Sequence, residues 1–127
     1  MASEKIKEYI EKTKKAGYND EQIKSALKKA GWNDAEIAET MGKQDNLDLL
    51  AQLSHFVNTG YSVLLGASRK RFMGVICDVS EPSELVTATA VTTALGVMAG
   101  VQLFRVHDVK ENRQAADVAS AVLSARI

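Results

Sequence analysis

The sequence predicts an α/β fold with about two parallel strands, preceded by a small helical module. The first observation is a change in composition near residue 44: the residues up to it carry nine lysines and no arginine, and those after it carry two lysines and five arginines. The second is that two apolar, β-rich runs, 61–67 and 101–106, are separated by a helical segment. The order α-β-α-β-α implies parallel strands joined by right-handed crossovers. We therefore predict two domains, 1–44 and 45–127.

An internal repeat organises the N-terminal module. The motif Ala-Gly-Tyr-Asn-Asp-Glu-Gln-Ile at 16–23 returns fourteen residues later, at 30–37, as Ala-Gly-Trp-Asn-Asp-Ala-Glu-Ile. In each copy the glycine can end one helix in the left-handed conformation, and the asparagine can cap the next helix. The repeat therefore predicts three helices, at about 3–15, 20–29 and 34–42.

The predicted core of this module is thin for its length. Tyr18 and Trp32 stand where a hydrophobic staple would pack against Ile23 and Ile37. Two aromatic residues in a small bundle are more often core than a docking surface, so a module that binds a partner helix through Trp32 is the alternative. The apolar set predicted to be buried is Ile6, Ile10, Tyr18, Ile23, Ala26, Leu27, Trp32, Ile37 and Met41.

A helix is expected to open the second domain. Asp45 or Asn46 is its predicted N-cap, and Asn58-Thr59-Gly60 is predicted to stop it. Leucines at helical spacing give it one apolar face. The predicted buried stripe is Leu47, Leu50, Leu53, Phe56 and Val57.

The remaining segments follow the alternation of helices and strands. After the strand at 61–67, residues 68–78 form a loop or a short helix. Pro82 and Ser83 start a helix that runs to about Ala99, where Gly100 ends it before the strand at 101–106. A final helix covers 111–125, and its predicted inward residues are Ala115, Val118, Ala119, Val122 and Leu123.

Composition limits the classes of partner. Sixteen basic residues balance sixteen acidic ones, so the chain has no net charge that would favour binding to nucleic acid or to an anionic membrane. The single cysteine, Cys77, excludes an internal disulfide, and with a charged N-terminus it predicts a cytoplasmic location. The uncharged stretch 85–104 contains a GxxxG pattern, but its threonines favour a helix packed closely on a sheet over a membrane span.

Two short polar motifs follow the two predicted strands. Gly-Ala-Ser-Arg-Lys at 66–70 follows the first strand, and Arg-Val-His-Asp at 105–108 lies at the end of the second. Parallel strands aim their carboxyl ends at the same edge of a sheet, so both motifs are expected to converge. Hydroxyl, guanidinium and ammonium groups together are typical of a site for phosphate or pyrophosphate. The predicted binding residues are Ser68, Arg69, Lys70, Arg105 and His107.

No catalytic residue is assigned from the pattern. Asp108 is expected to cap the last helix, and His55 is expected to lie on the surface. The sequence contains no metal-ligand spacing and no Ser/His/Asp arrangement, so we predict no metal and no protein-bound cofactor.

Three stretches together resemble the C-terminal part of dihydropteroate synthase: Asn46–Leu53, Val63–Lys70 and Arg105–Val109. The resemblance implies that residues 46–127 are a partial (β/α) barrel-type segment that contains the last two strands of a barrel. It also implies folate biosynthesis and a transferase ancestry. That family joins a pterin pyrophosphate ester, which carries Mg²⁺, to p-aminobenzoate and releases pyrophosphate.

The resemblance also implies roles for individual residues. Ser68 would touch the p-aminobenzoate end, and Lys70 would lie against both the pterin and p-aminobenzoate. Arg105 and His107 would bind the pyrophosphate, and Arg105 would also stack near the pterin. These implied partners are phosphate, pyrophosphate or a pterin pyrophosphate ester.

The sequence departs from the family in several places. The family's early Asn-Val-Thr-Pro-Asp-Ser-Phe-like strand, its pterin-binding Asp and Asn, and its Asp-Pro…Gly-Phe-Gly-Lys segment have no counterpart. We therefore expect a folded segment that is not catalytic alone, because orientation of the substrate supplies much of a rate enhancement. Catalysis after a partner completes the barrel is the alternative.

The helices at 3–42 are expected to be unrelated to the synthase family, which leaves three origins open. The chain is an engineered or recombined chimera, an excerpt that carries a foreign fusion, or a natural truncation. A partial barrel exposes sheet edges and apolar helix faces. Either the helices at 3–42 cover the open face, or two copies pair through it as a homodimer.

Overall fold

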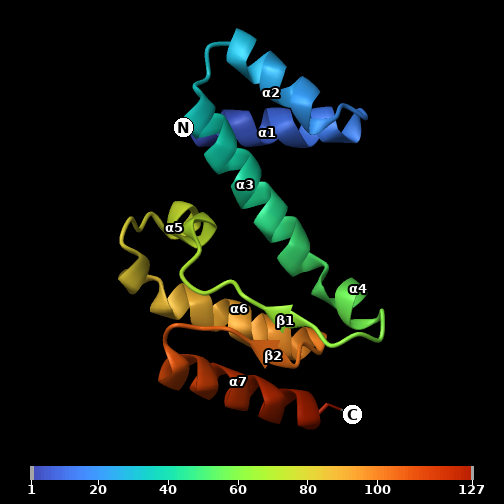
Figure 1. Cartoon of the computed structure of the whole chain (residues 1–127), viewed down its shortest axis with the longest axis vertical. Helices are drawn as coiled ribbons and strands as arrows, with labels where there is room; N and C mark the ends of the chain where they lie inside the picture. Colours follow the sequence, from blue (N-terminus) through green and yellow to red (C-terminus); the bar gives the residue numbers. More distant parts are fainter. Residues whose placement is uncertain (1, 127) are drawn as a thin grey trace. The chain divides into compact units, whose positions relative to one another are not determined.

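The computed structural model describes residues 2–126, which form two compact units (Figure 1). The first unit ends at Asp45, and the second begins at Asn46. The first contains α1 (Ala2–Lys15), α2 (Asp20–Lys29) and the beginning of α3 (Asp34–Ala51).

The repeat forms the helix ends that it predicts. Gly17 and Gly31 have φ values of 93° and 98°, so each occupies the left-handed conformation after its helix. Asn19 and Gln22 form a capping box, in which each side chain accepts a backbone N–H of the other at 2.9 Å. The Asn33 side chain likewise accepts the Glu36 N–H at 2.8 Å. The predicted starts of α2 and α3 are therefore confirmed at these caps.

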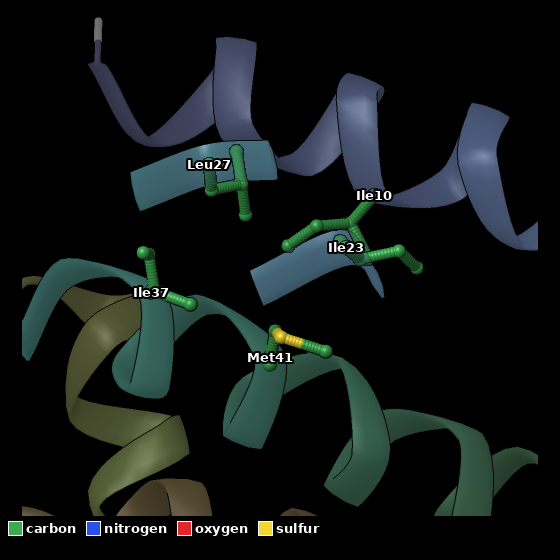
Figure 2. Packing of buried hydrophobic residues seen from close by; sticks show 5 residues of the cluster. All are labelled: Ile10, Ile23, Leu27, Ile37 and Met41. Atoms are coloured by element: carbon green, nitrogen blue, oxygen red, sulfur yellow. The ribbon is translucent and has the colours of Figure 1, made fainter. Parts of the chain in front are cut away.

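Five aliphatic side chains form the core of the first unit. Figure 2 shows Ile10 from α1, Ile23 and Leu27 from α2, and Ile37 and Met41 from α3 pointing toward one another. Trp32 is half-buried against them, as predicted. The prediction that Tyr18 joins this core is wrong, because 55% of Tyr18 is exposed. The aliphatic residues close the core without it, and its hydroxyl stays in water. Ile6 was also predicted to be buried, but its side chain lies outside the part of the chain that the structure describes.

Helix α3 continues through the predicted helix break. No cap forms at Asp45 or Asn46, because residues 34–51 are one helix. Gly42 is the only strong helix breaker in that range and costs about 1 kcal/mol relative to alanine, and its neighbours Lys43 and Gln44 are good helix formers. The break comes later, at Gln52 (φ −113°, ψ 21°), before the short α4 (Leu53–Val57).

The second unit is an α/β arrangement around two parallel strands. Strands β1 and β2 lie side by side, with Leu64 opposite Leu103 and Leu65 opposite Phe104 (Figure 1). The predicted parallel pairing is confirmed. Both strands are shorter than the predicted runs, since each has one partner strand in the described chain. After α4 the elements are β1 (Leu64–Leu65), α5 (Arg71–Cys77), η1 (Pro82–Glu84), α6 (Val86–Ala99), β2 (Leu103–Phe104) and α7 (Val109–Ser124).

Helix α6 packs on one face of the strands through a residue without a side chain. A Cβ atom at Gly96 would lie 2.6 Å from Phe104 and 3.1 Å from Leu65, so these two side chains fill the space beside the helix. Gly100 ends α6 with φ 99°, as predicted. Leu64 and Leu103 turn to the opposite face and are exposed in the described chain. Arg105 continues that second face, because alternate residues of a strand share a side.

Helix α7 packs through a face that includes the predicted Ala115 and Ala119 but not the larger apolar residues predicted with them. Its inner positions are Asn112, Ala115, Ala116 and Ala119, which follow the i, i+3, i+4, i+7 spacing of one helix face. The predictions that Val118, Val122 and Leu123 point inward are wrong, because all three are exposed. Small residues allow α7 to approach α6, and hydrophobicity alone does not indicate that the polar Asn112 is buried.

A second apolar cluster supports the loop after β1. Phe72, Met73 and Leu85 are buried together, and Leu47 and Leu50 are half-buried against them. Leu53 is buried as predicted, whereas Phe56 is exposed and does not extend the stripe. In the part of the chain that the structure describes, no helix is both long and apolar enough to cross a membrane.

Candidate anion-binding site

The two polar motifs follow β1 and β2 and therefore meet at one edge of the sheet. The Arg105 N–H donates to the Leu65 carbonyl oxygen at 3.1 Å, which places Gly66 beside Arg105. A Cβ atom at Gly66 would lie 3.1 Å from Arg105 Nη2. The guanidinium of Arg105 therefore lies across backbone that carries no side chain, and a side chain at position 66 would require the guanidinium to shift.

Ser68 and His107 are joined by two hydrogen bonds. The His107 backbone N–H donates to Ser68 Oγ at 3.0 Å, and Ser68 Oγ lies 2.7 Å from His107 Nδ1. Because the hydroxyl already accepts the amide, its own hydrogen is available to Nδ1 of a neutral ring. In the tautomer in which Ser68 donates to Nδ1, the neutral ring carries its proton on Nε2, which is then a donor on the far side of the imidazole.

The Arg69 side chain forms an ion pair with Asp108. Its Nη2 donates to Asp108 Oδ1 at 2.8 Å, and its Nε donates to Oδ2 at 3.1 Å. The side chains are 29% and 16% exposed, so the pair is partly shielded from water. These hydrogen bonds lower the pKa of Asp108 below its ordinary range and raise the pKa of Arg69. Asp108 does precede α7, but its side chain makes no capping bond because Arg69 holds it.

The turn that contains Arg69 is anchored from a third element. Arg69 has φ 56°, the left-handed conformation that is unfavourable for a residue with a side chain. Its backbone N–H donates to Thr89 Oγ1 on α6 at 3.0 Å, and Thr89 is fully buried. The Lys70 N–H donates to the Ala67 carbonyl oxygen at 3.2 Å, which closes the turn.

Two cations in this site have no acidic partner among the described residues. Lys70 Nζ reaches only the neutral Asn46 Oδ1, at 3.4 Å, and no carboxylate pairs with Arg105 in the described chain. Asp108 balances the charge of Arg69, so Lys70 and Arg105 leave a net positive charge. Both are exposed, as is His107. These three side chains lie on the two loops at this edge of the sheet, and cations of this kind form the strongest hydrogen bonds with anions.

The structure places the five predicted binding residues in or next to the two loops that follow β1 and β2, and it links those loops through two pairs that were not predicted. Ser68 and His107 contact each other, and Arg69 contacts Asp108, although the sequence analysis assigned these residues separately. A Ser/His/Asp relay does not result, because both carboxylate oxygens of Asp108 accept from Arg69. No sequence signal indicated Asn46 and Thr89 as supporting residues. His55 is exposed, as predicted.

The site residues do not fit a protein-bound Mg²⁺. Magnesium prefers carboxylate and water oxygens, and the carboxylate beside this cluster, Asp108, already binds a guanidinium. No group of three metal-ligating side chains occurs among residues whose positions are described.

Asn112 ties the start of α7 to α6 beneath the site. Thr93 Oγ1 donates to Asn112 Oδ1 at 2.6 Å, and Asn112 Nδ2 donates to the Asp108 carbonyl oxygen at 2.9 Å. Asn112→Ala would leave the buried Thr93 hydroxyl without this acceptor, and we expect a loss of about 1–3 kcal/mol in the free energy of unfolding. Urea denaturation measures it, with the exposed Gln114→Ala as control. Equal stability of the two variants would contradict the assigned bonds.

A family model confirms the ancestry of the chain. The model described as "Pterin binding enzyme" matches residues 2–107. The chain therefore belongs to the pterin-binding enzyme family. The match begins within the helical module, so it does not support an origin for that module outside the family.

Several of the individual relatives are dihydropteroate synthases. The Bacillus subtilis enzyme is 41% identical over 80 residues, which are 63% of this chain and 28% of that protein. The structure of the Yersinia pestis enzyme with a sulfonamide drug has a TM-score of 0.63 and 34% identity, and the match covers 66% of this chain and 30% of that one. The Thermus thermophilus enzyme in complex with 4-aminobenzoate gives a TM-score of 0.60 and 40% identity, over 63% of this chain and 31% of that one.

These comparisons confirm the predicted dihydropteroate synthase ancestry of a large part of the chain. The chain spans less than a third of the length of these relatives. Its two parallel strands with flanking helices agree with a partial α/β segment of those structures.

Proposed function

We propose that the chain binds the pyrophosphate group of a pterin pyrophosphate ester, or free pyrophosphate, at Lys70, Arg105 and His107. The observation that carries this proposal is the pair of cations, Lys70 and Arg105, without described acidic partners at the ends of two adjacent parallel strands. Ser68 orients the His107 ring, which presents an Nε2 donor in the tautomer that accepts the Ser68 hydroxyl at Nδ1. The family membership makes a phosphorylated pterin the expected ligand class.

We further propose that the chain alone does not catalyse synthesis of a pteroate. Binding through a pyrophosphate would hold one end of the substrate, whereas reaction needs both reactants oriented and shielded from water. The absence of counterparts to the family's pterin-binding Asp and Asn supports this view. Incubation with a pterin pyrophosphate ester and 4-aminobenzoate should give no product. Product formed only by self-associated chains would favour the alternative, completion of the barrel by a partner.

The origin of residues 1–44 is a separate proposal. The shift from lysine to arginine near residue 44 supports a chimera in which a repeat-built helical module precedes a synthase segment. The Bacillus subtilis relative aligns over 80 residues, which fits the second unit in length. The exposed Tyr18 supports an interaction role for the module as a second candidate function.

A pyrophosphate titration followed by amide NMR tests the binding proposal. We expect saturable shifts at residues 66–70 and 105–108, and about tenfold weaker binding in Lys70→Ala and in Arg105→Ala, since each removes a charge-assisted contact. Arg113→Ala is the matched control, because Arg113 is an exposed arginine on α7 that pairs with Asp117 at 3.0 Å. Shifts that do not saturate, or equal losses in all three variants, would show non-specific charge attraction.

A further inference from the structure

We propose that the Arg69–Asp108 ion pair is a positioning clamp that holds the anion site in its binding geometry, and that Arg69 is not itself an anion ligand. The nature of the anion rests on the proposed function. The clamp itself rests on contacts within the second unit. The proposed clamp gives new roles to Arg69, which the sequence analysis placed among the anion ligands, and to Asp108, which it placed at a helix cap.

The clamp joins the same two loops that carry the binding residues. Arg69 stands between Ser68 and Lys70, and Asp108 directly follows His107. The ion pair and the Ser68–His107 hydrogen bonds are therefore neighbouring links between one loop and the other. Together they fix the spacing between the loop with Lys70 and the loop with His107.

The backbone of Arg69 shows why a clamp is needed. Its φ of 56° is a conformation that a residue with a side chain keeps only when its surroundings impose it. Two sets of contacts impose it here: the backbone N–H donates to Thr89 Oγ1, and the side chain binds Asp108 with two hydrogen bonds. Loss of the side-chain contact leaves only backbone bonds, from Arg69 to Thr89 and from Lys70 to Ala67, and we expect the direction of Lys70 to become less defined.

The geometry also opposes a direct role for Arg69 in binding. The Nε edge of its guanidinium faces Asp108 in a bidentate arrangement, which adds energy and geometric specificity to the ion pair. To reach an anion with that edge, Arg69 would have to leave a carboxylate that is only 16% exposed. That carboxylate would then be poorly solvated and unpaired.

Asp108→Asn distinguishes a ligand role of Arg69 from a positioning role, because the two roles predict opposite changes in pyrophosphate affinity. The substitution removes a negative charge that repels an anion and releases Arg69 from its ion pair. If Arg69 were a ligand, pyrophosphate would therefore bind more tightly. A positioning role predicts binding weaker by about tenfold despite the lost repulsion, because the loops lose their spacing. Asp117→Asn breaks the exposed pair on α7 and is the matched control, with unchanged binding expected.

A second readout does not depend on the ligand. The ¹⁵N resonances of the His107 ring report the Ser68 hydrogen bond, and we expect them to shift in Asp108→Asn and in Arg69→Gln. The double variant should shift no further than either single variant, since one clamp is broken in each. Unchanged ring resonances in Asp108→Asn, or pyrophosphate binding as tight as in the wild type, would overturn the clamp.

The two proposals can fail separately. A wild-type chain that binds no pyrophosphate would refute the proposed function, and the His107 ring resonances would still decide the clamp. If Asp108→Asn does not fold, Arg69→Lys replaces it, because lysine keeps the charge without the bidentate fork. The clamp predicts a smaller ring shift in Arg69→Lys than in Arg69→Gln, and equal shifts would overturn it.

Discussion

Gly74→Ala is expected to destabilise the second unit by about 2–3 kcal/mol, although alanine is the better helix former. Gly74 lies within α5 and is buried. A Cβ atom there would lie 2.5 Å from the carbonyl oxygen of Val79. That oxygen cannot easily move away, because the Val79 N–H donates to the Gly74 carbonyl oxygen at 2.9 Å and holds the two backbones together. Chemical denaturation, followed by signals from residues 46–126, measures the loss.

Gly42→Ala is the matched control for this substitution. Gly42 also lies in a helix, α3, but a Cβ atom there meets nothing within 4 Å. Helix propensity then decides, and we expect a gain of about 0.5–1 kcal/mol. Opposite signs for the same chemical change would establish the contact of Gly74 with Val79. A stabilising effect of Gly74→Ala would contradict the described turn after α5.

The sequence predicted features of the fold that short-range chemistry controls. The asparagine caps and the left-handed glycines of the repeat appear where the pattern placed them, because a cap needs residues within one helical turn. The helix start predicted at Asp45 or Asn46 is wrong, although both residues are good caps. The residues around them are compatible with helix, and α3 therefore continues through them. The predicted inner face of α7 is right at its alanines but wrong at Val118, because hydrophobicity favoured valine, whereas close approach to α6 favours alanine and Asn112.

The same distinction between short-range chemistry and tertiary packing applies to the candidate site. The sequence identified which residues lie at the strand ends, because parallel strands bring their carboxyl ends to one edge. It did not predict which of these residues bind one another. Ser68 and His107, like Arg69 and Asp108, are 39 positions apart, and their pairing depends on the register of β1 against β2. No local pattern contains that register.

Ile23→Ala is expected to destabilise the first unit by about 3–4 kcal/mol, the largest effect among the proposed substitutions. Ile23 is 1% exposed and contributes to a core of five buried side chains. Removal of three carbon atoms from so small a core leaves a cavity that few neighbours can fill. The module has little stability to lose, because small domains bury a small fraction of their surface. Amide hydrogen exchange of α1 and α2 should therefore accelerate strongly.

Tyr18→Ala is the control, and it distinguishes the structure from the sequence pattern. The repeat places Tyr18 in the position that Trp32 has in the second copy. If Tyr18 were a core residue like Trp32, Tyr18→Ala would lower the free energy of unfolding about as much as Ile23→Ala. Tyr18 is mostly exposed, and we expect its loss to change the free energy of unfolding by less than about 0.5 kcal/mol. A large loss in Tyr18→Ala would place that ring in the core and would contradict the described packing. A small loss in Ile23→Ala would mean that the five-residue cluster does not hold α1 and α2 together.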